Sequence, residues 1–241
     1  MNEPDFDATK EFDSALEEIE TLIQQAKSAE SQSDGYAVYI KAAVVLLGAK
    51  LEAFAENIAD EYVRALSALQ LQARDLPDVV KITSTTFLLG SCVFESGFKK
   101  KPETLSKLKS AADLWRDDAV LDKLFVDTRF NYGKHGSGEL IGIFKRLGIE
   151  DICEECQISS SENTNFLTED TKESIASTVD SLTKIRNNVI HSDAKLADFT
   201  YQDVEKYSNK LREFCFLVDA KLASVRQQFE SKKAQAAALI S

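Results

Sequence analysis

The sequence predicts an all-α fold, a helical bundle, and three observations support this prediction. Only nine glycines and three prolines occur in 241 residues, so long stretches contain no helix breaker. Apolar residues recur every three or four positions, and no alternating strand pattern or internal repeat is present. A hydrophobic content of 44% is enough for an ordinary core. The length fits a single domain over residues 1–241.

The first half of the chain contains two expected helices. Residues 9–31 form an amphipathic pattern, and we expect this helix, within residues 1–34, to lie at the periphery of the domain. Residues 36–71 form a longer pattern that is apolar almost all round from 42 to 49, which is typical of a central helix. Gly48 and Ala49 in that stretch allow another backbone to approach closely, either within the fold or in a dimer.

The middle of the chain alternates short helices with loops. Residues 79–94 are expected to be helical in spite of a β-branched run, and Pro102 suits the first turn of a helix that reaches Trp115. A turn-rich loop is expected over 129–138, followed by a short helix over 139–147. Residues 157–167 are polar and loop-like.

The last third predicts two long helices that form a C-terminal antiparallel hairpin. Thr168 is expected to cap the first, with acidic residues in its first turn. Thr200 is expected to cap the second, with Asp203 completing a capping box and Phe199 packing on Val204 as a staple. The turn over 192–199 joins them. The second helix carries one apolar stripe: Val204, Tyr207, Leu211, Phe214, Val218, Leu222, Val225 and Phe229. Residues 223–241 extend this helix.

Charge and terminal composition limit the classes of function. The net charge is −11 and the pI about 4.8, which argues against an extended duplex-binding surface. The N-terminus has no apolar signal region, and the longest apolar run, 42–49, is too short to cross a bilayer. We therefore expect a cytoplasmic protein without a membrane segment. The cluster around Lys99, Lys100 and Lys101 is either a solvated face or a patch that guides RNA or a partner.

The four cysteines are expected to be reduced thiols. Cys153 and Cys156 form a C-x-x-C, but no second ligand pair follows, and the glutamates between them should raise the thiol pKa. We expect no metal and no cofactor.

The most informative stretch runs from Arg186 to His191. It places an arginine, the amide of Asn187 and one of two histidines within six residues of a helical pattern. On a helical wheel Arg186 falls in the middle of an apolar stripe, so it is either paired with an acid or lines an anion-binding face. His191 falls about 140° away, so either the helix frays near Ile190 or a site forms across a two-fold interface.

These residues resemble the motif of the HEPN superfamily, in which an arginine and a polar residue precede a histidine. Arg186, Asn187 and His191 match it. Residues 46–54, including Leu51-Glu52-Ala53-Phe54, resemble the early helix of RiboL-PSP-type and related prokaryotic HEPN proteins, and residues 131–149 resemble the loop and short helix before the motif. The resemblance covers about residues 35–222. The position two residues after the histidine, a tyrosine in HEPN toxins paired with nucleotidyltransferase antitoxins, is Asp193 here, which puts that route of modification in doubt.

The resemblance implies a metal-independent endoribonuclease, a toxin or antiviral defence effector, whose composite site forms in a homodimer. Arg186, Asn187 and His191 would be catalytic, and Lys99, Lys100, Lys101 and His135 are candidates for binding substrate. RNA and an antitoxin or defence-system protein are the implied partners. The alternative is a catalytically inactive HEPN-like module that binds RNA or protein. For His135 the choice lies between reaching the site and an ordinary surface position.

Overall fold

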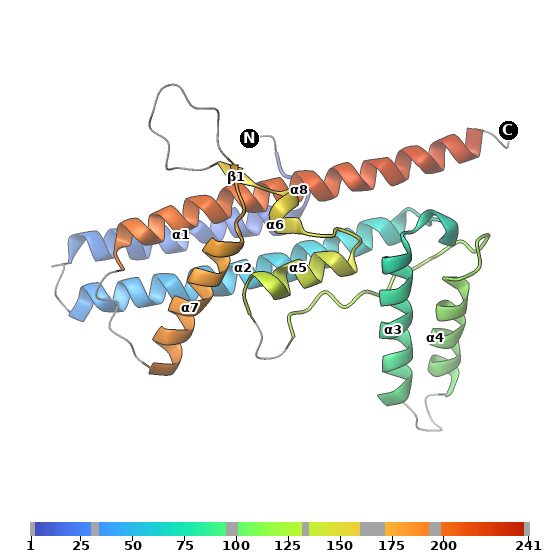
Figure 1. Ribbon diagram of the computed structural model, residues 1–241, viewed down its shortest axis with the longest axis horizontal. Coiled ribbons are helices and arrows are strands. Elements are labelled where there is room, and N and C mark those ends of the chain that lie inside the picture. The colour runs from blue at the N-terminus through green and yellow to red at the C-terminus, as the bar shows by residue number, and fades with distance from the viewer. Residues whose placement is uncertain are drawn as a thin grey trace. The chain divides into compact units, whose positions relative to one another are not determined.

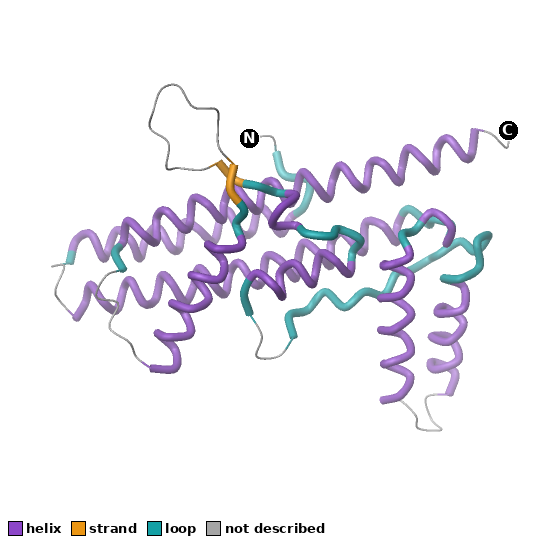
Figure 2. Tube along the Cα trace, viewed as in Figure 1, coloured by secondary structure: helices purple, strands orange, loops and turns teal. Residues whose placement is uncertain are grey.

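The computed structural model describes residues 3–29, 34–94, 101–131, 135–159, 172–192 and 199–238. The prediction of an all-α fold is confirmed, because helices account for nearly all regular structure of the described residues (Figures 1 and 2). The α-helices are α1 (Asp7–Ser28), α2 (Asp34–Ala68), α3 (Asp78–Phe94), α4 (Lys101–Asp113), α5 (Ser137–Arg146), α6 (Ile152–Glu155), α7 (Ala176–Ser192) and α8 (Tyr201–Ala238). A 3-10 turn, η1 (Ala73–Asp75), follows α2.

The chain divides into two compact units. The first comprises Met1–Ile58, Phe130–Ile141 and Asp151–Lys221, and the second comprises Ala59–Arg129, Gly142–Glu150 and Leu222–Ser241. The helices α2, α5 and α8 each contribute residues to both units. The single domain over residues 1–241 stays a prediction.

The core of the first unit is formed by apolar stripes of α1, α2 and α8. Helix α1 buries Ile19 and Ile23, and its Phe12 ring lies 5.5 Å, centroid to centroid, from that of Phe54 in α2. The stripe of α8 that the sequence predicts is buried at Val204, Leu211, Phe214 and Val218 in this unit, and at Leu222 and Phe229 in the second unit. The early part of α2 buries Val44 and Leu47, as expected of a central helix.

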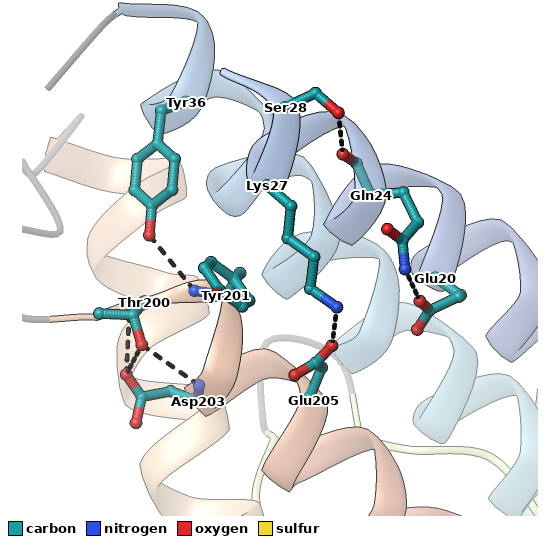
Figure 3. A network of polar contacts seen from close by, with 9 residues as sticks. All are labelled: Glu20, Gln24, Lys27, Ser28, Tyr36, Thr200, Tyr201, Asp203 and Glu205. Atoms are coloured by element: carbon teal, nitrogen blue, oxygen red, sulfur yellow. Dashed lines mark hydrogen bonds and ion pairs between the residues drawn. The ribbon is translucent and has the colours of Figure 1, made fainter. Parts of the chain in front are cut away.

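The start of α8 confirms the predicted capping box (Figure 3). The backbone N–H of Thr200 and its hydroxyl both donate to Oδ2 of Asp203, at 2.7 and 2.8 Å, and the N–H of Asp203 donates to the Thr200 hydroxyl at 3.4 Å. Phe199 contacts the ring of Tyr207, with centroids 5.7 Å apart. The predicted connecting turn lies almost wholly outside the described residues.

The N-terminus of α1 is capped from a distant helix. Phe6 precedes α1 and makes no side-chain cap bond of its own. The carboxylate of Asp219 in α8 accepts hydrogen bonds from the N–H groups of Asp5 and Phe6, both at 3.0 Å, and from the hydroxyl of Thr9 at 2.8 Å. This carboxylate satisfies donors that an uncapped helix end leaves without partners, and it joins α1 to α8.

The expected start of the next-to-last helix at Thr168 is wrong. Thr168 itself lies outside the described residues, but Lys172–Glu173 form a short strand, β2, and α7 begins only at Ala176. Strand β2 pairs antiparallel with β1 (Ile158–Ser159), within a region expected to be loop. Strands of two residues are too short to show an alternating pattern. Because residues 172 and 173 use their backbone groups in this pairing, α7 begins only after them, at Ala176.

The second unit includes a pair of packed helices, α3 and α4. The indole N–H of Trp115, just after α4, donates to the Thr85 hydroxyl of α3 at 2.9 Å. Both helices also carry exposed apolar side chains, among them Val93 and Leu105. Nowhere in the described part of the chain is a helix long and apolar enough to span a bilayer.

Candidate functional site

Arg186 lies in a pocket of the first unit, on the apolar face of α7 where the sequence places it. Its side chain is 15% exposed, and Nη1 donates to Oε1 of Glu52, in α2, at 2.7 Å. The pocket is lined from α2, α7 and the segment around the start of α5: Gly48, Leu51, Glu52, Phe130, Gly136, Leu140, Val179, Leu182, Thr183 and Arg186. Of the two alternatives for Arg186, the structure shows the pairing with an acid, and the binding of an anion in this pocket stays a prediction.

Gly48 makes the room that the Arg186 side chain occupies. A Cβ atom at position 48 would lie 2.9 Å from Cδ of Arg186 and 3.6 Å from its Nε. The close approach expected at Gly48 is therefore made by a side chain, and not by the backbone of another helix. Nε of Arg186 is buried and has no hydrogen-bond partner among the described residues. One edge of the guanidinium is thus held by Glu52, and the stem is fixed against α2.

His135 reaches the same carboxylate as Arg186. Its Nδ1 lies 2.7 Å from Oε1 of Glu52, and its side chain is 28% exposed. His135 thus contacts Glu52, the partner of Arg186, and its role in binding substrate stays a prediction. Glu52 joins three segments that are far apart in sequence: α2, the residues before α5, and α7.

The backbone on both sides of His135 is held by carboxylates. Before it, the N–H of Phe130 donates to Oε1 of Glu56 at 2.9 Å. After it, the N–H and hydroxyl of Ser137 donate to the two oxygens of Asp180, in α7, at 2.8 and 2.9 Å. Asp180 thereby caps α5, whose first residue is Ser137. Gly136 has a φ of +100°, a conformation that glycine adopts without strain.

His191 does not share the Arg186 pocket. Helix α7 continues through Ser192, so the fraying expected near Ile190 does not occur. His191 is exposed in the last turn, Asn187 is half-buried, and Ile190 is 50% exposed. An unbroken helix places His191 about 140° around the axis from Arg186 and about 7.5 Å along it. That His191 lies at an interface between two copies stays a prediction.

The lysine cluster belongs to the second unit. Lys101 is exposed at the start of α4, whereas Lys99 and Lys100 lie outside the described residues. The acid–base and guanidinium groups that the structure brings together, Glu52, His135 and Arg186, all belong to the first unit.

Cys153 and Cys156 are buried thiols at α6. Burial, more than the neighbouring acids, raises the pKa of each thiol to about 12, so the cause expected from the glutamates is the smaller one. Such thiols are poor nucleophiles at neutral pH. In the described ranges no three His, Cys, Asp or Glu side chains are grouped to hold a metal ion.

Sequence reasoning missed the partners of the predicted residues. Glu52 and Asp180 were not assigned roles, although both are central to the geometry of the site. One signal was available for Glu52: it follows Gly48 by four residues in a helix, so a small residue and an acid share one face. No local signal links Asp180 to Ser137, which lies 43 residues earlier.

The fold and the motif together define an all-α protein of HEPN type. A family model described as RiboL-PSP-HEPN matches residues 10–224, and the chain therefore belongs to the RiboL-PSP-HEPN family. Neither the curated proteins nor the solved structures contain a match to this chain. Membership of the family indicates a nuclease-like or RNA-related role.

Proposed function

We propose that this protein is a metal-independent endoribonuclease of HEPN type. His191 takes the proton of the RNA 2′-hydroxyl, and the 2′-oxygen attacks the adjacent phosphorus. The bond from phosphorus to the 5′-oxygen breaks, and a second histidine protonates that oxygen. Arg186 stabilises the charge that develops on the non-bridging oxygens, and Asn187 orients the histidine or the phosphate. The products are a 2′,3′-cyclic phosphate and a 5′-hydroxyl.

The observation that supports this proposal is the contrast between Arg186 and His191. The arginine is fixed in a pocket by Glu52, while the motif histidine is exposed on another side of the same helix. One protomer therefore does not bring the two together. We propose a homodimer in which a second copy completes the site, so that the partner's His191 is available as the second histidine. A toxin or antiviral defence effector that acts on cytoplasmic RNA, restrained by an antitoxin or defence-system protein, fits this reading.

The second candidate function is a catalytically inactive module that binds RNA or a partner protein. One observation favours it: the Arg186 guanidinium already has a carboxylate partner at 2.7 Å. A phosphate would have to share the guanidinium with Glu52. The net charge of −11 also weakens non-specific attraction to RNA.

A cleavage assay distinguishes the two candidates. Structured and unstructured RNA are incubated in EDTA with wild-type protein, Arg186→Ala, His191→Ala and the control Lys184→Ala, whose residue is exposed on α7. We expect a loss of about 10²–10⁴-fold for the first two variants, no loss for the control, and no cleavage of a 2′-deoxy substrate. Equal activity of all four proteins, or activity that requires added metal, contradicts the proposed mechanism. Binding of RNA without cleavage supports the inactive module.

The oligomeric state gives an independent check. Sedimentation at micromolar concentration should yield a dimer, and a strictly monomeric active enzyme would rule out the composite site.

A further inference from the structure

His135 and the Arg186 guanidinium share one partner, the carboxylate of Glu52. Nδ1 of His135 and Nη1 of Arg186 both lie 2.7 Å from one atom, Oε1 of Glu52. His191, by contrast, is five residues along α7 from Arg186 and exposed. Within the first unit, the guanidinium is therefore accompanied by a histidine outside the family motif.

The contact with Glu52 determines which ring nitrogen is available for chemistry. Nδ1 lies 2.7 Å from Oε1 of Glu52, an ion-pair distance, so Nδ1 is the ring nitrogen that faces the carboxylate. A carboxylate on one ring nitrogen fixes the tautomer and the orientation of an imidazole. Nε2 is then the nitrogen that exchanges protons with a substrate.

The position of His135 is fixed by more than this single contact. Glu56 holds the N–H of Phe130 at 2.9 Å, and Asp180 holds both donors of Ser137 at 2.8 and 2.9 Å. The amide of Asn131 donates to Oε2 of Glu139 at 2.6 Å. Asp180 therefore fixes Ser137, two residues after His135, to α7. A general acid or base needs its backbone held.

We propose that His135 is the general acid of the cleavage reaction, with Glu52 as its positioning residue. The imidazolium of His135 donates its Nε2 proton to the 5′-oxygen as the bond from that oxygen to phosphorus breaks. The leaving group departs as a neutral hydroxyl, and His135 becomes the neutral imidazole with its Nδ1 proton still directed at Glu52. His191 has meanwhile gained the 2′-hydroxyl proton, so protons balance. Arg186, beside the acid, faces the non-bridging oxygens.

This inference rests on the proposed function and changes one part of it. The second histidine is then His135 of the same chain that supplies Arg186, and the partner's His191 is not needed as the acid. A purely structural His135 is the competing reading. The two roles predict different losses of activity when His135 is replaced. A general acid is not needed for a leaving group that departs without a proton, whereas a structural residue is needed for every substrate.

The test compares two substrates in EDTA: an RNA oligonucleotide and uridine 3′-(4-nitrophenyl phosphate), whose nitrophenolate leaves without a proton. The variants are His135→Ala and His135→Gln; glutamine keeps a donor for Glu52 but transfers no proton. We expect kcat on RNA to fall about 100-fold for both variants, and kcat on the ester to stay within about threefold of wild type. His191→Ala, which removes the base, should lose activity on both substrates.

Glu52→Gln tests the positioning role. We expect kcat on RNA to fall about tenfold with KM little changed, and a smaller loss on the ester. Thermal unfolding of each variant checks that the fold is retained, and His135→Gln keeps the test decisive if His135→Ala is unstable.

The outcomes separate this inference from the proposed function. Equal losses on the two substrates, or full activity of His135→Gln on RNA, overturn the acid role while leaving the endoribonuclease intact. If the wild-type protein cleaves neither substrate, the proposed function is wrong and the acid role falls with it.

Discussion

Two positions in the C-terminal half of α7, Arg186 and His191, differ in how much of their surroundings this chain supplies. Around Arg186 the chain supplies a carboxylate partner, a glycine that makes room for the side chain, and apolar walls. One and a half turns later, Ile190 is 50% exposed and His191 is exposed. Arg186 is thus held in place by residues of its own protomer. Ile190 and His191 instead present an apolar and a titratable side chain at the surface of the protomer.

This difference shows why a linear motif is a poor guide to a site. Arg186 and His191 are five residues apart in sequence, but the continuous helix directs them about 140° apart. Glu52 and His135 are more than 50 residues from Arg186 in sequence, yet one oxygen of Glu52 contacts both His135 and Arg186. Under the proposed function, Arg186 would bind the phosphate in its own protomer, and His191 would act on a substrate bound to another copy.

Among the variants that change the surroundings of Arg186 and leave the motif intact, Gly48→Ala is expected to have the largest effect. In a helix interior alanine is about 1 kcal/mol better than glycine, so Gly48→Ala should not unfold α2. The new Cβ would lie 2.9 Å from Cδ of Arg186, so the side chain must move. We expect kcat/KM on RNA to fall about 10–100-fold, because small displacements of a charge-stabilising group are costly.

Gly90→Ala is the matched control for this variant. Gly90 also lies within a helix, α3, and a Cβ there meets no heavy atom of the described residues within 4 Å. Its activity should match the wild type, and its stability should rise by about 1 kcal/mol. If Gly48→Ala behaves like Gly90→Ala, the enclosure of Arg186 has no bearing on function.

A smaller effect is expected from loosening the segment that carries His135. Asp180→Ala removes the two hydrogen bonds to Ser137 and the cap of α5. We expect about 1 kcal/mol of lost stability in urea unfolding and about a tenfold loss of RNA cleavage. Asp151→Ala removes a comparable cap, since Asp151 accepts from the N–H groups of Cys153 and Glu154. Loss of activity in both variants would show that the effect is general destabilisation.

Much of the fold could be predicted because its determinants are local. The stripe of α8 from Val204 to Phe229 and the box formed by Thr200 and Asp203 are complete within short windows, and both are found as expected. The helix start at Thr168 failed because pairing between β1 and β2 takes precedence over a local capping signal. A tertiary contact decided that boundary, and no short window contains it.

The site was predictable only in part for the same reason. The helical wheel placed Arg186 on the apolar face of its helix, where a guanidinium needs a charged partner. It could not identify that partner as Glu52, because Glu52 belongs to another helix. The sequence left two alternatives for His135, because its placement depends on carboxylates from α2 and α7. Residue type and spacing therefore predicted Arg186 and the motif, whereas the contact of His135 with Glu52 depends on tertiary packing.

The smallest effect is expected on the stability of the exposed end of α7. His191→Ala should change the free energy of unfolding by no more than about 0.5 kcal/mol, because an exposed side chain in a last turn makes few contacts. Arg186→Ala should cost about 1–2 kcal/mol, since it removes a partly buried charged hydrogen bond to Glu52. Urea unfolding at low protein concentration, where a dimer dissociates, measures both. A cost for His191→Ala that appears only at high concentration would place this end of α7 in the interface, whereas an equal cost for the two variants in the monomer would contradict the contrast between the two positions.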